Sequence, residues 1–246
     1  MSTLANFRDI ATAAPGIEPG IKPGVYYRSD APAVGDSAPP AAPAWPPATV
    51  FDLRDPSESA GPHGLDGTAT VHRVKVFEDA AISNLIKNSG STTLDAMYAT
   101  LITSPQAEAL TGVVRGIATE PGPVLVHCSA GKDRAGITAA LVLALVDAPR
   151  EAIVADYTAT AANMPGVMER FMAAMPPEMR AAAEQSGLAN ADARITELLA
   201  APAEAIESVL DAWDAWDGGV EGWYLAHGGD AETLAALRAR LREGTQ

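Results

Sequence analysis

The segment VLVHCSAGKDRAGITAALVLAL, residues 124–145, decides how this chain folds. It opens with a short apolar run that is typical of a buried strand. It closes with an apolar stretch that is long enough for a helix. The loop between them carries Cys128 and Gly131 and leads into Arg134. This order of strand, tight loop and helix predicts an α/β fold with a central sheet flanked by helices.

The loop has the residue types of a phosphate-binding site. Backbone amides of the loop and of the first helical turn are free to donate, and a helix N-terminus carries partial positive charge. Gly131 and Gly136 allow the backbone to approach an anion closely, and Arg134 can donate two hydrogen bonds to one phosphate. The predicted phosphate-binding residues are Ser129, Ala130, Gly131, Lys132, Asp133 and Arg134.

Cys128 is the only cysteine, so it has no intramolecular disulfide partner and belongs to no cysteine cluster that binds zinc. A lone cysteine is often just a small buried hydrophobic residue. Here the loop amides and Arg134 favour the thiolate, which can attack phosphorus and form a phosphocysteine that water hydrolyses. We therefore predict that Cys128 is a nucleophile and that the reaction uses no metal and no organic cofactor.

A nucleotide-binding loop is the obvious competitor, because the Gly131-Lys132 pair also occurs there. That motif needs a Ser or Thr after the lysine to bind magnesium, and this chain has Asp133. It also needs a glycine five residues before Gly131, where this chain has Val126. The segment therefore does not fit a nucleotide-binding loop.

Five segments resemble one protein family. HCSAGKDRAG, residues 127–136, resembles the HCxxGKDR loop of cysteine-dependent tyrosine phosphatases, in particular the bacterial branch of atypical tyrosine and dual-specificity phosphatases that also hydrolyse phosphoinositides. Residues 6–9 (NFRD) and 27–29 (YRS) resemble two further motifs of that branch, and residues 51–54 (FDLR) with Glu58 resemble its DLR…E motif. The closing segment, residues 218–241, is similar to its last helices, so the resemblance spans residues 6–242.

The resemblance implies a single catalytic domain, residues 1–246, with a helical C-terminal part. It also implies a protein-tyrosine phosphatase with dual-specificity or phosphoinositide activity as an addition. One departure is Ala135, where the family has a Thr or Ser whose hydroxyl assists departure of the cysteine sulfur. Ala135 therefore favours, as the alternative, a catalytically impaired module that only binds phosphate. A rhodanese-like sulfurtransferase also uses a cysteine loop, and Asp133-Arg134 argues against it.

The general acid is less clearly marked than the nucleophile. Expelling an alkoxide or phenolate needs a proton donor close to the leaving oxygen. Asp133 lies in the loop, and the resemblance assigns the matching aspartate this role, whereas Asp79 follows a predicted strand at the place where other members of the superfamily carry their acid. We favour Asp133 over Asp79. His127, Asp52 and Arg54 are predicted to support the loop, His127 through a backbone hydrogen bond and the other two as a local ion pair.

The remaining chain changes from strands to helices. Short β-branched or aromatic runs predict strands at 25–28, 49–54 and 70–77, with an exposed proline-rich connection between the first two. Apolar residues at three- and four-residue steps predict helices from about residue 94 to 102 and from 105 to 119. The loop helix is predicted to run from 134 to 146, and the rest of the chain is predicted to be helical with restarts at Pro165, Pro176-Pro177 and Pro202.

Five of the seven methionines lie between residues 164 and 179 at helical spacing. Methionine fills irregular gaps, so the simpler interpretation is ordinary packing of a helix against the core. The alternative, which the family resemblance also implies, is a helical lid over the catalytic loop, at residues 163–190.

Lys and Arg number 17 and Asp and Glu number 31, which gives a net charge of 17 − 31 = −14. Such a chain repels polyanions, so we predict no nucleic-acid partner. The longest apolar run, residues 137–146, is too short for a membrane span of about 20 residues, so we predict no stable membrane insertion. The family resemblance implies phosphorylated protein (phosphotyrosine) or phosphoinositide as the substrate. The first ten residues lack the pattern of a secretory signal, which predicts a cytoplasmic protein and leaves export without such a signal open. The sequence does not give the oligomeric state.

Overall fold

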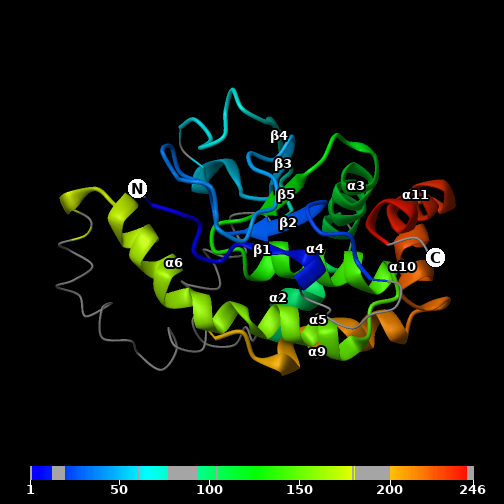
Figure 1. The fold of residues 1–246 in the computed structure, drawn as a ribbon. Coiled ribbons are helices and arrows are strands. Elements are labelled where there is room, and N and C mark those ends of the chain that lie inside the picture. The colour runs from blue at the N-terminus through cyan, green and yellow to red at the C-terminus, as the bar shows by residue number, and fades with distance from the viewer. Residues whose placement is uncertain are drawn as a thin grey trace.

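The computed structural model describes residues 2–12, 20–59, 61–76, 94–103, 105–178, 180 and 200–242. Its centre is a five-stranded sheet with the order β1-β2-β5-β3-β4 (Figure 1). β1 is antiparallel to β2, and all other neighbours are parallel. The strands are β1 Arg8–Asp9, β2 Tyr26–Ser29, β3 Thr49–Asp52, β4 Thr70–Arg73 and β5 Val124–His127.

The register of the parallel strands brings their last residues together. His127, at the end of β5, lies opposite Ser29 of β2 and Asp52 of β3. Asp52 in turn lies opposite Arg73 of β4. The carboxyl ends of parallel strands are where α/β folds collect their functional loops. Here the loop that carries Cys128 leaves the sheet at the middle of this row.

The two faces of the sheet are covered differently, because side chains alternate along a strand. Tyr26, Phe51 and Val126 join the large core, which the helices cover. Tyr27, Val50 and Leu125 join a smaller cluster with side chains from the N-terminal segment and from loops. The proline-rich connection after β2 is largely exposed, as predicted, but its Trp45 packs on this smaller cluster.

The helices are α2 Leu94–Leu101, α3 Gln106–Thr119, α4 Asp133–Leu145, α5 Arg150–Thr158, α6 Thr160–Ala174, α9 Ala203–Asp214, α10 Gly219–Ala226 and α11 Ala231–Leu241. Two short 3-10 turns are η1 Ile10–Thr12 and η2 Pro56–Glu58. In Figure 1, α2, α4, α5 and α9 lie below the sheet, and α3 and α11 lie side by side near the C-terminal end of the described chain. No helix in the described part of the chain is both long and apolar enough to cross a membrane. The predicted α/β fold with a helical C-terminal part is confirmed.

The predicted restarts of the helices are confirmed in part. Pro202 directly precedes α9, and α6 ends just before Pro176. The restart predicted at Pro165 is wrong, because α6 continues through that residue and the break lies at Ala159 instead. A proline removes one hydrogen bond to the carbonyl four residues earlier, here that of Ala161. Ala161 is exposed, so water can satisfy this carbonyl without ending the helix.

The strands differ from the prediction mainly in length. β4 ends at Arg73, although the apolar pattern predicted a strand through residue 77, and β3 ends at Asp52 rather than at residue 54. The two-residue strand β1 was not predicted, because so short a segment has no periodicity of its own.

Helix α6 covers the first part of the predicted lid. Met164 is buried on it, and Met168 and Met172 are half-buried. Its Arg170 forms ion pairs with Asp30 and Asp36, at 2.7 Å each, in the segment after β2. The rest of the predicted lid, residues 179 and 181–190, lies outside the described residues, so the lid stays a prediction.

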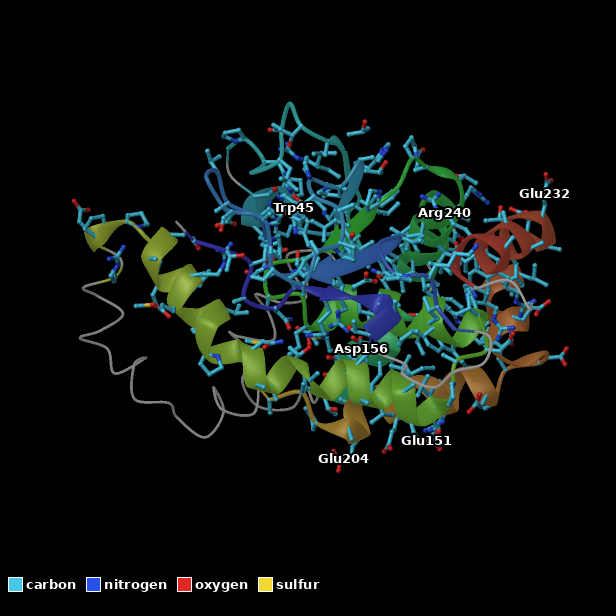
Figure 2. All side chains as sticks on the ribbon, in the orientation of Figure 1. Trp45, Glu151, Asp156, Glu204, Glu232 and Arg240 are labelled. Atoms are coloured by element: carbon cyan, nitrogen blue, oxygen red, sulfur yellow. The ribbon has the colours of Figure 1, made fainter. Side chains whose placement is uncertain are left out.

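The outer sides of the helices are acidic. Figure 2 labels Glu151 on α5, Glu204 on α9 and Glu232 on α11, and all three point away from the body of the protein. The net charge of −14 is therefore presented in part by the helical layer.

Candidate active site

Cys128 directly follows β5 and is 2% exposed. Its Sγ accepts a hydrogen bond from the backbone amide of Gly131 at 3.2 Å. Gly131 has a φ of +71°, and a Cβ at this position would lie 2.4 Å from the carbonyl oxygen of Ser29. Only glycine fits this turn without strain, so the tight curl of the loop around the sulfur depends on Gly131.

The carbonyl groups of the loop point away from the cysteine, and each has a donor outside the loop. Because a peptide unit directs its N–H opposite to its C=O, outward carbonyls leave the amides of the loop facing inward. Such a row of inward amides forms a concave site for an anion. The contacts are Cys128 O with His127 Nδ1 (3.0 Å), Ser129 O with Ala31 N (3.1 Å), Ala130 O with Asn6 Nδ2 (2.9 Å) and Gly131 O with Arg28 NH2 (2.6 Å).

A buried ionic cluster lies beneath the loop. Arg28 of β2 has no exposed surface and forms an ion pair with Asp156 of α5. Asp156 also accepts from Arg8 of β1 at 2.9 Å, and Figure 2 shows Asp156 in the interior, between sheet and helices. Burial opposes its charge, but the two guanidinium groups hold the pKa of Asp156 below its ordinary value. The cluster therefore fixes Arg28 as a permanent donor to the loop.

Arg134, in the first turn of α4, is oriented by Glu58. The guanidinium forms two parallel hydrogen bonds with the carboxylate, at 2.6 and 2.7 Å, and a third with the carbonyl of Leu53 at 3.1 Å. Glu58 also accepts from the hydroxyl of Ser129 at 2.8 Å. Burial opposes both charges, but the mutual hydrogen bonds raise the pKa of Arg134 and lower the pKa of Glu58. Arg134 is thus a fixed cation beside Cys128.

Glu58 is itself positioned by the turn that carries it. The side chain of Asp55 accepts from the amide of Ser57 at 3.0 Å, and Glu58 accepts from the amide of Asp55 at 2.9 Å. These reciprocal contacts are a capping box, here on the short turn η2.

Asp52 and Arg54 form the ion pair that the sequence predicted. The two hydrogen bonds measure 2.8 and 2.7 Å, and Asp52 is buried at the end of β3. Burial opposes its charge, yet the bonds to Arg54 and the nearby His127 lower the pKa of Asp52 to about 2. Their supporting role at the loop stays a prediction.

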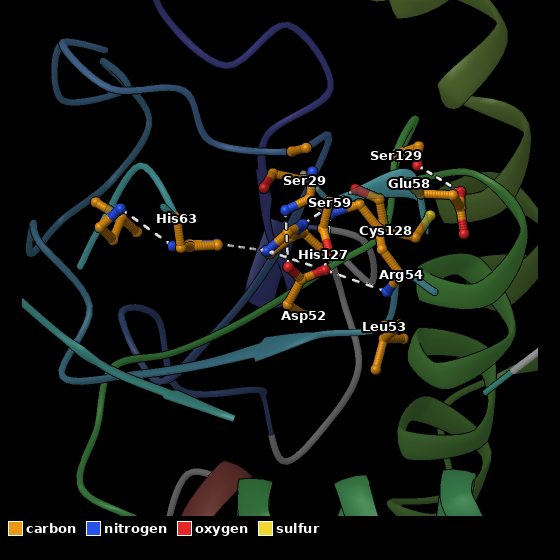
Figure 3. A network of polar contacts seen from close by, with 12 residues as sticks. Ser29, Asp52, Leu53, Arg54, Glu58, Ser59, His63, His127, Cys128 and Ser129 are labelled. Carbon is orange, nitrogen blue, oxygen red and sulfur yellow. Dashed lines mark hydrogen bonds and ion pairs between the residues drawn. The ribbon is translucent and has the colours of Figure 1, made fainter. Parts of the chain in front are cut away.

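His127 is completely buried and bonds to the backbone of Cys128, as predicted. Its other nitrogen, Nε2, lies 2.8 Å from Nε2 of His63 (Figure 3). Because His127 Nδ1 faces a carbonyl oxygen, it must carry the proton, so His127 Nε2 accepts from His63. His63 Nδ1 then accepts from the amide of Leu65 at 3.1 Å. Both imidazoles are neutral in this chain of hydrogen bonds, and burial lowers the pKa of His127 to about 3 and also lowers that of His63.

Asp52, His63 and His127 are also the one group of potential metal ligands within the described ranges. The two Nε2 atoms that would bind a metal are joined to each other by the hydrogen bond. The geometry therefore fits a neutral histidine pair rather than a ligand set for a metal such as zinc, which binds imidazole nitrogen at about 2.0–2.1 Å.

Asp133 is the first residue of α4, and its side chain is 31% exposed. One of its carboxylate oxygens accepts from the hydroxyl of Tyr98 at 2.6 Å and lies 3.4 Å from the ammonium of Lys132. Burial and the nearby Asp133 raise the pKa of Tyr98 well above its ordinary value, so Tyr98 remains a donor. Tyr157 lies behind it, with the two hydroxyl oxygens 2.6 Å apart. Asp79, the alternative acid, lies outside the described residues.

Several residues of this site had no assigned role in the sequence. Asn6 and Arg28 belong to segments that only resembled family motifs, and the structure shows them bonded to the loop. Glu58 could have been found, since a capping-box pattern from Asp55 to Glu58 predicts a turn at the sheet edge. His63 and Tyr98 carry no local signal.

An α/β fold with an amide-lined cysteine loop between a strand and a helix defines a phosphatase of the cysteine-loop class. A family model described as the tyrosine phosphatase family matches residues 1–243, and the chain belongs to this family. It is 27% identical over 212 residues to the triple specificity protein phosphatase PtpB of Mycobacterium tuberculosis. The matched region covers 71% of this chain and 76% of that relative. It is also 47% identical over 49 residues to a tyrosine-protein phosphatase of Nostoc commune. That matched region covers 20% of this chain and 17% of the relative.

Proposed function

We propose that this phosphatase hydrolyses phosphotyrosine in proteins through a phosphocysteine intermediate on Cys128. The observation that carries the proposal is the orientation of the loop, whose carbonyls are all bonded outward around a buried sulfur. Inward amides and the fixed guanidinium of Arg134 together stabilise the charge that develops on a transferring phosphoryl group.

In the first step, Sγ of Cys128 attacks phosphorus, an S–P bond forms, and the bond to the leaving oxygen breaks. Asp133 donates its proton to that oxygen, so the product leaves as a neutral alcohol or phenol. In the second step, water attacks phosphorus, the S–P bond breaks, and the carboxylate of Asp133 accepts a proton from the water. Tyr98 donates to one oxygen of Asp133, which restricts the orientation of the carboxyl group.

We propose a substrate range wider than phosphotyrosine, with phosphoserine, phosphothreonine and phosphoinositides as secondary substrates. One support is the mycobacterial relative, which is named as a triple specificity protein phosphatase. Another is Lys132, a buried cation at the loop whose ammonium contacts the carbonyl of Ala200 at 3.0 Å. A second cation beside Arg134 suits a highly charged phosphate ester.

The proposal is tested with wild type and Cys128→Ser on a phosphotyrosine peptide in the presence of EDTA. We expect Cys128→Ser to lose turnover completely. It should keep its fold and its affinity for inorganic phosphate, because the phosphate contacts of the loop amides and of Arg134 do not depend on the sulfur. Acid quenching of wild type during turnover should trap a phosphoryl group on Cys128, detected by mass spectrometry. Substantial activity in a pure Cys128→Ser preparation would overturn the mechanism.

The alternative function is a module that binds phosphate without turnover. Ala135 favours it, since this residue is completely buried beside the loop and has no hydroxyl to assist the second step. Tight binding of a phosphopeptide to wild type, without release of phosphate, would support this alternative.

A further inference from the structure

A second cationic pocket lies beside the phosphate loop. It is lined by Arg54, Pro56, Ser59, Arg73 and Lys75. All five residues follow or end the parallel strands β3 and β4, so the pocket opens at the same edge of the sheet as Cys128. The charged lining therefore comes from two different strands that meet at this edge.

The charges of the pocket are only partly balanced. Arg54 is paired with Asp52, and Lys75 lies 3.0 Å from Asp55 with half of its side chain exposed. Arg73 is exposed, and its side chain forms no hydrogen bond or ion pair with any residue that the structure describes. Among the residues that the structure describes, the three cations of the lining together form ion pairs with two carboxylates, in a protein whose net charge is −14.

The charges of this region also act on the buried His63. Burial has the largest effect in lowering the pKa of His63; Arg54 and Arg73 lower it further, whereas Asp52 and Asp66 raise it. On an acidic protein, a pocket lined by several cations is the place where an anion is attracted locally.

The pocket and the phosphate loop share a wall. Ser59 lines the pocket, and the preceding residue, Glu58, accepts from Ser129 of the loop (Figure 3). Glu58 also binds Arg134 in the first turn of α4. Arg73 lies opposite Asp52, and Asp52 lies opposite His127, the residue before Cys128. Two strand spacings of about 4.8 Å each separate the backbone of Arg73 from that of His127, which gives about 10 Å.

We propose that this pocket binds a second phosphate of the substrate, so that the enzyme prefers peptides that carry two phosphorylated residues. The inference rests on the proposed function for the loop. Adjacent residues of an extended peptide advance about 3.3 Å, so a second phosphate two or three residues away reaches about 7 to 10 Å. The guanidinium of Arg73 can then donate two hydrogen bonds to that phosphate.

A doubly phosphorylated peptide fits these observations better than a phosphoinositide in a bilayer. An anionic membrane repels the acidic exterior of this protein as a whole, while a peptide presents its few charges only at the site. The pocket also lies to one side of the loop, along the sheet edge, where an extended chain can run across both.

The test compares a phosphotyrosine peptide with versions that carry a phosphoserine two or three residues before or after the phosphotyrosine. We expect wild type to show at least a tenfold higher kcat/KM on the best doubly phosphorylated peptide, through a lower KM. Arg73→Gln should reduce this ratio to about one. The matched control Arg115→Gln, which removes a half-exposed arginine on α3, should keep it.

Equal kcat/KM for all peptides in wild type, or an unchanged ratio in Arg73→Gln, would overturn the proposal. The proposal would also be overturned if kcat/KM depended on Arg73 only for a water-soluble inositol bisphosphate. That result would assign the pocket to a lipid headgroup. Dissociation constants of the same peptides with Cys128→Ser separate this proposal from the proposed function. If the wild type shows no turnover, the proposed hydrolysis fails. A binding preference for the doubly phosphorylated peptide that needs Arg73 would still support the pocket.

Discussion

Helices α4 and α6 have nearly the same length, 13 and 15 residues, and are held in opposite ways. Eleven residues of α4 are buried, whereas only three residues of α6 are. α4 is apolar on all sides, so the core fixes it along its whole length. α6 depends on polar contacts at three points: Arg8 binds Thr160 at 2.9 Å, Asn163 donates to Asn6 at 3.1 Å, and Arg170 binds the segment after β2.

The comparison shows which part of the site is rigid. The first turn of α4 carries the residues proposed for chemistry. Apolar packing holds the backbone of this helix, while Glu58 and Tyr98 orient the side chains of Arg134 and Asp133. α6 reaches the loop through intermediate residues. Arg170 donates to the carbonyl of Ala31, whose amide donates to Ser129, and Asn163 donates to Asn6, whose side chain donates to Ala130. Variants in α4 should therefore change the chemistry, and variants in α6 should change stability first.

The largest effect after loss of the nucleophile is expected for Arg134→Lys. Lysine keeps the charge but loses the two parallel hydrogen bonds, both to Glu58 and to a phosphoryl group. We expect kcat/KM to fall by about a hundredfold or more, which corresponds to about 2.7 kcal/mol of transition-state stabilisation. Steady-state kinetics on an aryl phosphate measures the effect, and a loss of only a few-fold would show that Arg134 does not bind the phosphoryl group.

A smaller and more selective effect is expected for Asp133→Asn. This variant cannot protonate the leaving oxygen, so hydrolysis of alkyl phosphates should slow by about tenfold to a hundredfold. A substrate whose leaving group has a low pKa departs without a proton and should lose much less. The kinetics of a series of aryl phosphates checks this dependence. The same dependence in Asp79→Asn, and not in Asp133→Asn, would move the acid to Asp79.

The sequence predicted the residues of the site that are close to one another along the chain. The loop from Cys128 to Arg134 and the pair Asp52 and Arg54 are local, so their composition and spacing indicated their chemistry. The residues that hold the loop come from far away in the sequence: Asn6 lies 124 positions from Ala130, and Arg28 lies 103 positions from Gly131. The pairings of β1 with β2 and of β2 with β5 bring them there, and these pairings are not visible in a local pattern.

The histidine pair behind the loop should make stability depend on pH. The unfolded chain binds protons at histidine below a pKa of about 6.5, while His127 in the folded protein, with a pKa of about 3, does not. Stability is therefore lost as the pH falls below about 6.5, by about 2 kcal/mol at pH 5 for His127 alone. His63 has a lowered pKa too and adds to the loss.

The variant His63→Gln isolates this contribution, because a glutamine amide can still donate to His127 while carrying no proton equilibrium of its own. Urea unfolding at pH 7 and at pH 5 should show a smaller loss in His63→Gln than in wild type. Equal losses in the two proteins would mean that His63 does not stay neutral in the fold.

The smallest effect on catalysis is expected for Arg170→Gln on α6. The variant leaves Asp30 and Asp36, both within the segment that Arg170 binds, without their ion pairs. We expect a melting temperature several degrees lower, since loss of a partner for a buried charge costs about 1–3 kcal/mol. The kcat/KM for a small aryl phosphate should stay within about twofold of wild type. A large loss on this substrate would show that α6 orders the phosphate loop, which would remove the contrast with α4.

The acidic outer sides of the helices have a consequence for how quickly a substrate arrives. A phosphate ester diffusing toward this protein first meets repulsion from the helical exteriors, and it is attracted only once it comes within about 10 Å of the cations at the sheet edge. Added salt weakens that repulsion more than it weakens the short contacts inside the site. For an anionic substrate whose capture limits the rate, moderate ionic strength therefore speeds the encounter, whereas an enzyme with a cationic exterior is slowed by the same salt.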